Sequence, residues 1–174
     1  MCVDFTASVC HDSVMDTNPA PRKLHVIDVE NLIGHGEICP AEASHCRDIY
    51  EQTGLVGPRD HVVVACNPYI GVDVGSCWQP SRLLVRHGHD GADHALIQVL
   101  TTERIEDRFT EVVVASGDGV FTDVVVWLQA HDVEVTVVAA ARSLAARLRL
   151  AASRVVLFEL PPAPAPAAAR KEAA

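Results

Sequence analysis

Short valine-rich apolar runs alternate along this chain with segments of helical character, and this alternation constrains the fold more than any other feature. The pattern predicts strands at residues 24–29, 61–66, 82–86, 111–115, 133–139 and 155–160, and helices at 40–52, 91–103, 119–130 and 143–152. Residues 69–80, broken by glycine and proline, are expected to form a short helix or a loop. Strands that alternate with helices pair in parallel through right-handed crossovers. The sequence therefore predicts an α/β fold, a three-layer sandwich with a mainly parallel central sheet flanked by helices.

The composition agrees with a buried parallel sheet. Apolar residues make up 49% of the 174 residues and aromatic residues only 5%, which suits strands covered on both faces by helices. The length suffices for one domain with a sizeable core. No apolar run approaches the roughly 18–20 residues of a membrane span, and no basic start precedes an apolar stretch. We therefore expect a soluble cytoplasmic protein with no membrane partner.

The two ends of the chain differ from its centre. Residues 1–21 show no period and end in an Asn-Pro-Ala-Pro turn sequence, and residues 161–174 are rich in Pro and Ala. Both segments are expected to be disordered, which leaves residues 22–160 as the folded domain. Met15 shortly precedes the first expected strand, so translation could begin at Met1 or at Met15.

Charge and cysteine content limit the function classes. The formal net charge of −9 is a mild argument against tight, non-specific DNA binding, so attraction to a nucleic acid would have to come from a local basic patch and from metal. The six cysteines form no C-x-x-C pair, and no histidine spacing completes a zinc site. We expect reduced thiols.

Three aspartates stand where the predicted elements meet. Asp28 ends the first strand, Asp118 follows the strand at 111–115, and Asp93 opens the helix between them. The carboxyl ends of parallel strands share one edge of a sheet, where ligands bind. Carboxylates gathered there would repel one another, and a divalent cation with a preference for oxygen ligands would relieve that repulsion. We therefore predict Asp28, Asp93 and Asp118 as catalytic residues that hold Mg²⁺ or Mn²⁺.

Other polar residues surround these three positions. The Asn31 amide could orient a water molecule or a phosphate oxygen, although Asp28 and Asn31 could instead simply cap the next segment. Ser116 precedes a glycine-containing turn at the start of a helix, where anions bind. Asp123 is either a fourth metal ligand or an ordinary first-turn acid. Asp90 is expected to cap the helix at 91–103.

Arginines supply candidate contacts to a phosphate backbone. Arg82 and Arg86 precede the Asp93 helix, and Arg142 and Arg149 lie seven residues apart, on one face of a helix that extends that far. A solvated surface face is the plain alternative. Aromatic residues are too few to argue for base stacking from the sequence.

These motifs resemble those of the NYN domain family, a branch of the PIN-like nuclease superfamily. The matching segments are D-x-E-N-L at 28–32, G-A-D-x-A-L at 91–96 and S-G-D-G-x-F at 116–121, and the resemblance spans residues 23–158. It implies a PIN-like sandwich, Mg²⁺- or Mn²⁺-dependent ribonuclease chemistry, and functional roles for Asp28, Asp93, Asp118 and Asn31. Many members carry another acid where this chain has Val120, a position that Asp123 could replace from one turn along.

The resemblance favours a metal-dependent ribonuclease with an RNA substrate and no organic cofactor. RNA is preferred to DNA on the resemblance alone. The main alternative is a catalytically weak or inactive PIN-like module that binds RNA or a protein. A phosphatase of the haloacid dehalogenase type is disfavoured, because the D-x-D pair and the later lysine are missing. The assembly could be a homodimer.

Overall fold

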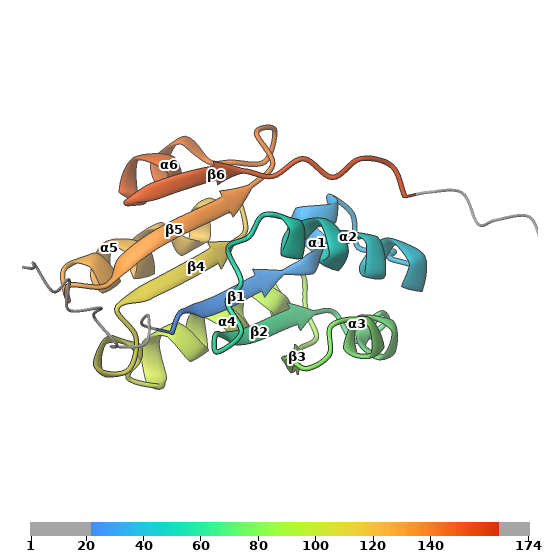
Figure 1. Ribbon diagram of the computed structural model, residues 1–174, viewed down its shortest axis with the longest axis horizontal. Coiled ribbons are helices and arrows are strands. Elements are labelled where there is room, and N and C mark those ends of the chain that lie inside the picture. Colours follow the sequence, from blue (N-terminus) through green and yellow to red (C-terminus); the bar gives the residue numbers. More distant parts are fainter. Residues whose placement is uncertain (1–21, 164–174) are drawn as a thin grey trace, which may run out of the picture.

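The computed structural model describes residues 22–163, and six parallel strands form its central sheet (Figure 1). The strand order is β3-β2-β1-β4-β5-β6. The strands are β1 (Leu24–Asp28), β2 (His61–Cys66), β3 (Arg82–Val85), β4 (Glu111–Ala115), β5 (Glu134–Ala139) and β6 (Arg154–Leu157). This architecture confirms the predicted α/β fold with a parallel central sheet.

Helices cover both faces of the sheet. One face carries α1 (Val29–Ile33), α2 (Pro40–Gln52) and α3 (Gly71–Cys77), and the other carries α4 (Gly91–Thr102), α5 (Thr122–Gln129) and α6 (Ala146–Ala151). Two 3₁₀ turns, η1 (Ile105–Asp107) and η2 (Gly119–Phe121), precede β4 and α5. The result is the three-layer arrangement expected from the alternating pattern.

Alternation along the central strands supplies both cores. In β4, Val112 and Val114 pack under α4 and α5, whereas Val113 and Ala115 pack under the helices of the other face. Successive side chains of a strand point to opposite faces. The sequence of a central strand that helices cover on both faces is therefore a continuous apolar run.

Most predicted elements are confirmed, and the helix expected at 143–152 is the main correction. It begins only at Ala146, because residues 141–143 form a turn and Ala145 is extended, with its amide donating to the Gly117 carbonyl at 2.8 Å. The segment at 119–130 starts as the 3₁₀ turn η2 before α5, and the last strand ends at Leu157. In each case a tertiary contact or a turn replaces regular helix or strand at the element's end.

The predictions of disorder fall mainly on residues 1–21 and 164–174, which lie outside the described residues. Of the predicted tail, only residues 161–163 are described, and the Pro161 carbonyl accepts a hydrogen bond from His45 Nε2 at 2.9 Å. None of the helices within residues 22–163 is long and apolar enough to span a membrane. Cys39, Cys46, Cys66 and Cys77 are free thiols.

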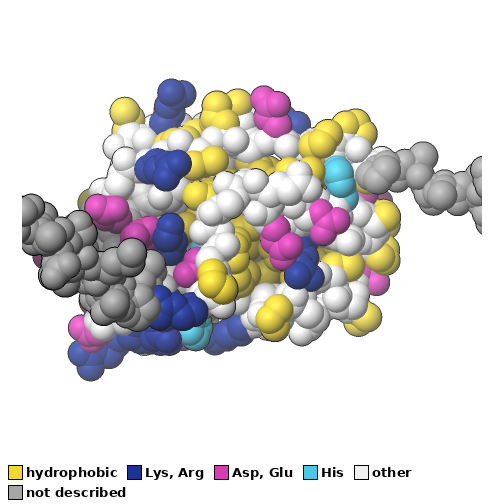
Figure 2. Space-filling view, viewed as in Figure 1, with side chains coloured by type: hydrophobic (Ala, Val, Ile, Leu, Met, Phe, Trp, Pro, Cys, Tyr) yellow, Lys and Arg dark blue, Asp and Glu magenta, His cyan; other side chains and the backbone are white. Residues whose placement is uncertain are grey.

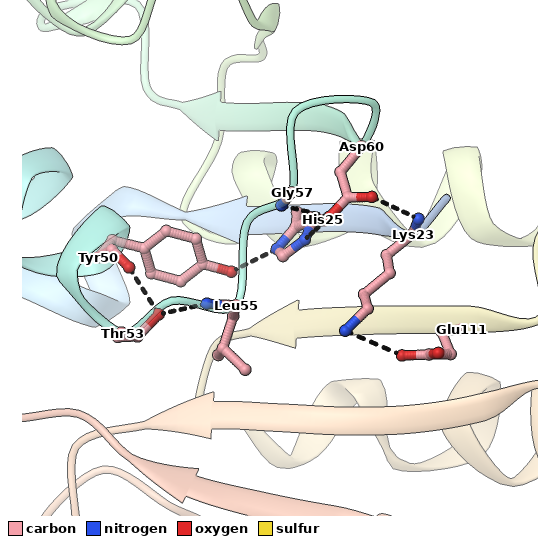
Figure 3. Close-up of polar contacts among 8 residues, drawn as sticks. All are labelled: Lys23, His25, Tyr50, Thr53, Leu55, Gly57, Asp60 and Glu111. Carbon is pink, nitrogen blue, oxygen red and sulfur yellow. Dashed lines mark hydrogen bonds and ion pairs between the residues drawn. The ribbon is translucent and has the colours of Figure 1, made fainter. Parts of the chain in front are cut away.

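A buried network of hydrogen-bonded side chains holds the amino end of β1 in place (Figure 3). The His25 ring lies between the Tyr50 hydroxyl of α2, 2.8 Å from its Nδ1, and the Asp60 carboxylate, 3.3 Å from its Nε2. Asp60 also accepts from the backbone amides of Gly57 and Lys23 at 2.7 and 2.8 Å. This network thus connects β1, α2 and the loop before β2.

Burial and hydrogen bonding determine the protonation states of His25 and Asp60 in this network. Burial lowers the pKa of His25 below its usual 6.5 despite the neighbouring Asp60, so the ring is neutral near pH 7. Burial opposes ionisation of Asp60, but hydrogen bonds from the Lys23 and Gly57 amides lower its pKa overall. Because the carboxylate only accepts, Nε2 carries the His25 proton and Nδ1 accepts from the Tyr50 hydroxyl.

The neutral His25 makes the stability depend on pH. The unfolded ring binds a proton near pH 6.5 and the folded ring only at lower pH, so its contribution to stability is present above pH 6.5 and is lost as the pH falls. At pH 7.5, His25→Leu should lower the free energy of unfolding by about 1–3 kcal/mol, because two buried polar groups lose their partner. The measurement is urea unfolding from pH 7.5 to 5.

The difference between wild type and His25→Leu isolates this histidine from other titrating groups. We expect the difference to shrink as the pH falls, whereas the exposed-histidine control His87→Gln should follow the wild type throughout. A difference independent of pH would contradict the neutral buried ring.

Candidate active site

Asp28 occupies the centre of the sheet's carboxyl edge. It is the last residue of β1, which pairs with β2 on one side and β4 on the other, so the strand order changes direction beside it. Ligands of open parallel sheets bind at this point. Leu24 and Val26 face α4, and alternation places Asp28 on the same face. Its side chain is buried, with 5% exposure.

Asp93 approaches Asp28 from the first turn of α4. The helix begins in direct contact with the chain leaving β3, since a Cβ on Gly91 would lie 2.4 Å from the Arg86 carbonyl oxygen. This close approach brings Asp93, itself only 9% exposed, toward the end of β1. Asp93 is close enough to Asp28 for its charge to raise the pKa of Asp28.

The electrostatics of the pair are unfavourable for two negative charges. Burial raises the pKa of Asp28, and the charge of Asp93 raises it further. Burial also raises the pKa of Asp93, with a smaller contribution from the charge of Asp118. Asp93 Oδ1 is buried and has no hydrogen-bond partner. An unpaired carboxylate oxygen beside a second carboxylate fits a cation as its missing partner.

Asp118 lies at the rim of the same edge. Its side chain is exposed, and its Oδ1 accepts from the Val120 amide at 2.9 Å, which caps η2. Within residues 22–163, no three His, Cys, Asp or Glu side chains form a group close enough to hold a metal ion together. The structure therefore brings Asp28 and Asp93 together and leaves Asp118 within electrostatic range of them.

Asn31 and Ser116 connect β1 to the loop after β4. Asn31 Oδ1 accepts from the Gly117 amide at 2.9 Å. The fully buried Ser116 hydroxyl donates to Asp28 Oδ2 at 3.4 Å and accepts from the Asp118 amide at 3.3 Å. Both side chains are therefore engaged within the protein and hold the Asp28 and Asp118 segments against each other.

Asp28 also caps α1, since its Oδ1 accepts a hydrogen bond from the Asn31 amide at 3.1 Å. The expected cap at Asp90 is wrong. Asp90 stands at the N-cap position of α4 without a side-chain cap bond, and its carboxylate pairs with His89 Nδ1 at 2.6 Å. Asp123 is exposed in the first turn of α5, unlike the buried Asp28 and Asp93.

The predicted arginines divide between the two edges of the sheet. Two of them lie at the carboxyl edge. Arg86 follows β3 and donates to Gln98 of α4 at 3.4 Å. Arg142 donates to the Ile33 carbonyl at 3.4 Å.

The other two lie toward the amino edge. Arg82 starts β3 and pairs with Glu103 at 2.7 Å. Arg149 is exposed in the last turn of α6, a helix that returns toward this edge. Because α6 starts at Ala146, Arg142 and Arg149 do not share a helix face.

On the face shown in Figure 2, positive charge is also found toward the amino edge of the sheet. Most of the Lys and Arg side chains visible in Figure 2 lie on the left of the view, where the strands of Figure 1 begin. A further arginine of the same basic segment, Arg147 of α6, reaches the site edge. The Arg147 guanidinium lies against Gly119, where a Cβ would come within 2.4 Å of its Nε. Arg147 therefore adds a positive charge beside the Asp118 loop.

Sequence reasoning did not foresee the contact between Glu30 and Asn67. Glu30 Oε1 accepts from the backbone and side-chain amides of Asn67, whose side chain also donates to the Gly36 carbonyl at 3.2 Å. In the sequence, Asn67-Pro68 gave only a turn signal. This contact forms one wall of an open groove of about 680 Å³ along the site edge.

The sequence model of the NYN domain family matches residues 75–159, just under half of the chain, and this match confirms the resemblance to that family seen in the sequence motifs. The matched range includes Asp93 and Asp118, whereas Asp28 and Asn31 precede it.

A crystal structure of a protein of unknown function from Vibrio parahaemolyticus has a similar fold. Its TM-score is 0.56 at 16% sequence identity, and the alignment covers 80% of this chain and 94% of that chain. At this identity the similarity supports the fold alone. A search of curated proteins finds no match to the sequence.

The loop after β4 gives a direct test of the site's packing. A Cβ on Gly117 would lie 2.5 Å from the Ser143 carbonyl oxygen, a backbone atom. Gly117→Ala should therefore lower the free energy of unfolding by about 1–3 kcal/mol, because the loop must shift to make room. Thermal or urea unfolding measures the change. Gly36→Ala is the matched control, since its Cβ would meet neighbours only at 3.7 Å and beyond. Equal stability of the two variants would contradict the tight packing.

Proposed function

We propose that this protein is a ribonuclease that hydrolyses phosphodiester bonds of RNA with Mg²⁺ or Mn²⁺. The observation that carries the proposal is the buried Asp28–Asp93 pair at the change of strand order, in which Asp93 Oδ1 has no partner. A protein that buries two carboxyl groups side by side retains an arrangement that is destabilising when both groups are ionised. Such arrangements are concentrated at functional sites. The NYN match supports the choice of a nuclease and of RNA.

In this proposal Asp28 and Asp93 hold the divalent ion, and Asp118 approaches it from the rim. Oxygen donors of this kind suit Mg²⁺ and Mn²⁺. When bound, the ion supplies a Lewis acid beside the scissile phosphate. Asp123 would contribute from α5 in place of the acid that is missing at Val120.

The neighbouring residues position the carboxylates and the substrate. Asn31 and Ser116 fix the β1 end against the β4 loop through their bonds to Gly117 and Asp28. Such supporting residues hold ligands in a productive orientation. Arg86 and Arg142, at the carboxyl edge, would hold the phosphates that flank the scissile bond.

Two observations support the alternative of a binding module with weak or no turnover. Position 120 is a partly exposed valine where the family resemblance implies an acid, and one oxygen of Asp118 is engaged in capping η2. A module of this kind would bind RNA or metal without cutting.

Metal binding is testable without any activity. Mn²⁺ or Mg²⁺ should raise the melting temperature of the wild type, since an ion that binds only the folded state at about 100 times its Kd adds about 2.7 kcal/mol. Asp93→Asn should abolish this rise. Without metal, the same variant should be at least as stable as the wild type, because it removes a charge beside Asp28. Differential scanning fluorimetry with EDTA and with each ion measures both effects.

Two further variants sharpen the metal test. Asp48→Asn replaces an exposed carboxylate on α2 and should leave the metal-induced rise unchanged. A reduced rise in Asp123→Asn would identify Asp123 as a ligand. An equal rise in wild type and Asp93→Asn would exclude the proposed ion site.

Cleavage of a labelled RNA tests the reaction itself. We expect cutting with Mn²⁺ or Mg²⁺ and none with EDTA. Asp28→Asn, Asp93→Asn and Asp118→Asn should each reduce the rate by at least about 100-fold, and Asn31→Ala by about 10–100-fold through misplacement of the ligands. Gel electrophoresis of the products gives the rates, with Asp48→Asn as the control. Metal binding without cleavage by the wild type would establish the alternative of a binding module.

A further inference from the structure

The strand β3 forms one outer edge of the sheet. It pairs with β2 on one side and ends the strand order, opposite β6 (Figure 1). The amide of Arg86, directly after β3, donates to the Cys66 carbonyl of β2 at 3.4 Å. Backbone groups alternate in direction along a strand, so those of Leu83 and Val85 face away from β2. Such an edge is a template for pairing with another extended chain.

The face of β3 that lies toward α4 carries positive charge at both ends. Leu84 packs against the core under α4. Arg82 and Arg86, two residues before and after it, donate on the same face to Glu103 at 2.7 Å and to Gln98 at 3.4 Å. Alternate positions of the edge strand therefore present the order Arg-Leu-Arg.

A groove of about 220 Å³ runs between β3 and α4 at this edge. Its apolar lining includes Leu84, Ala95 and Val99, and both Arg82 and Arg86 line it as well. Arg82 already has a carboxylate partner, whereas Arg86 forms no ion pair within residues 22–163. The groove thus combines an apolar part with positive charge on either side, and one of the two cations is available for an external carboxylate.

The other face of the same edge is apolar and exposed. Val85 is half-exposed, and a Cβ on Gly71 of α3 would lie 3.1 Å from it. Tyr69 and Val72, close to Gly71 in the chain, are almost fully exposed. Exposed apolar groups gathered beside polar ones mark interaction surfaces, so both faces of this edge offer contacts to an added strand.

The charge of this edge favours an acidic partner over a second copy of the chain. In an antiparallel pair of β3 strands centred on Leu84, Arg82 of each copy would stand opposite Arg86 of the other. Like charges in opposite positions destabilise a strand pair. The whole chain carries a formal net charge of −9, so an acidic partner would be repelled elsewhere and directed to this local pair of arginines.

We propose that the β3 edge is a docking site for an extended acidic and apolar segment of a partner protein, which adds to the sheet as a further strand beside β3. One apolar side chain of the segment lies over Leu84 in the groove. Acids two residues before and after it pair with Arg82 and Arg86, and the apolar residues between them face Val85. Strand addition is an established mode of peptide recognition in which backbone hydrogen bonds give affinity and alternate side chains give specificity. The inference goes beyond the proposed ribonuclease function and does not depend on it.

A short peptide with this pattern tests the charge pairing. The probe is the fluorescein-labelled peptide Gly-Ser-Glu-Val-Leu-Val-Glu-Ser-Gly, titrated with the full chain in EDTA and followed by fluorescence anisotropy. Arg86→Glu should weaken binding by about 5- to 30-fold, because an attraction becomes a repulsion. It should also bind the peptide in which Lys replaces both Glu residues better than the wild type does. Arg154→Glu, at the start of the opposite edge strand β6, is the matched control and should bind like the wild type.

Backbone methylation tests whether the peptide binds as a strand. Neighbouring amides of a strand point to opposite sides, so N-methylation of the first Val or of the Leu blocks opposite edges of the peptide. One of these two peptides should bind about tenfold more weakly and the other should bind like the parent. In the protein, hydrogen exchange of the Leu83 and Val85 amides should slow when the peptide is bound, whereas the amides of β6 should be unaffected.

Several results would overturn the inference. Absence of saturable binding to the wild type, equal binding of the Glu and Lys peptides, or equal effects of the two methylations would each reject it. An equal loss of binding in Arg86→Glu and Arg154→Glu would show that only the overall charge matters. Sedimentation of the wild type as a dimer, with slow exchange at Leu83 and Val85 in the absence of peptide, would assign this edge to a second copy instead.

Discussion

Two carboxyl groups buried side by side at the end of the central strand are the constraint on which the rest of this site depends. Removing Asp28 and Asp93 from water is costly, and their mutual repulsion adds to the cost. The surrounding contacts relieve part of it: the Asn31 amide and the Ser116 hydroxyl bond to Asp28, while one oxygen of Asp93 stays without a partner. This unrelieved conflict supports the proposal that a cation binds there.

The buried polar groups at the two ends of β1 differ in how completely they are hydrogen-bonded. At the amino end, His25 is neutral and bonded to both Tyr50 and Asp60, so the chain of hydrogen bonds is complete within the protein. At the carboxyl end, the donors are too few for the carboxylates gathered there. A satisfied network stabilises the strand and an unsatisfied one lacks a partner, which supports the proposal that the functional site is at the carboxyl end.

Local signals predicted much of this arrangement. The valine runs and the Pro40 and Gly54 boundaries gave β2, β4 and α2 at their observed bounds, and the three aspartates were placed at the correct element ends. Errors arose where a distant segment decides the backbone. The helix α6 begins at Ala146, later than predicted, because the Ala145 amide bonds to the Gly117 carbonyl. The predicted helix face shared by Arg142 and Arg149 therefore does not form. The Glu30–Asn67 bond and the position of Tyr69 had no sequence signal beyond a turn.

The sequence by itself determined which segments are strands or helices and which residues end them, because hydrophobic period and turn chemistry act over a few neighbouring residues. Only the tertiary structure decided that β1 lies between β2 and β4, that α4 brings Asp93 against Asp28 while Asp118 stays at the rim, and that a groove with an exposed tyrosine follows the same edge. These features depend on strand order and on the packing of helices against the sheet, and both join segments that are far apart in the chain.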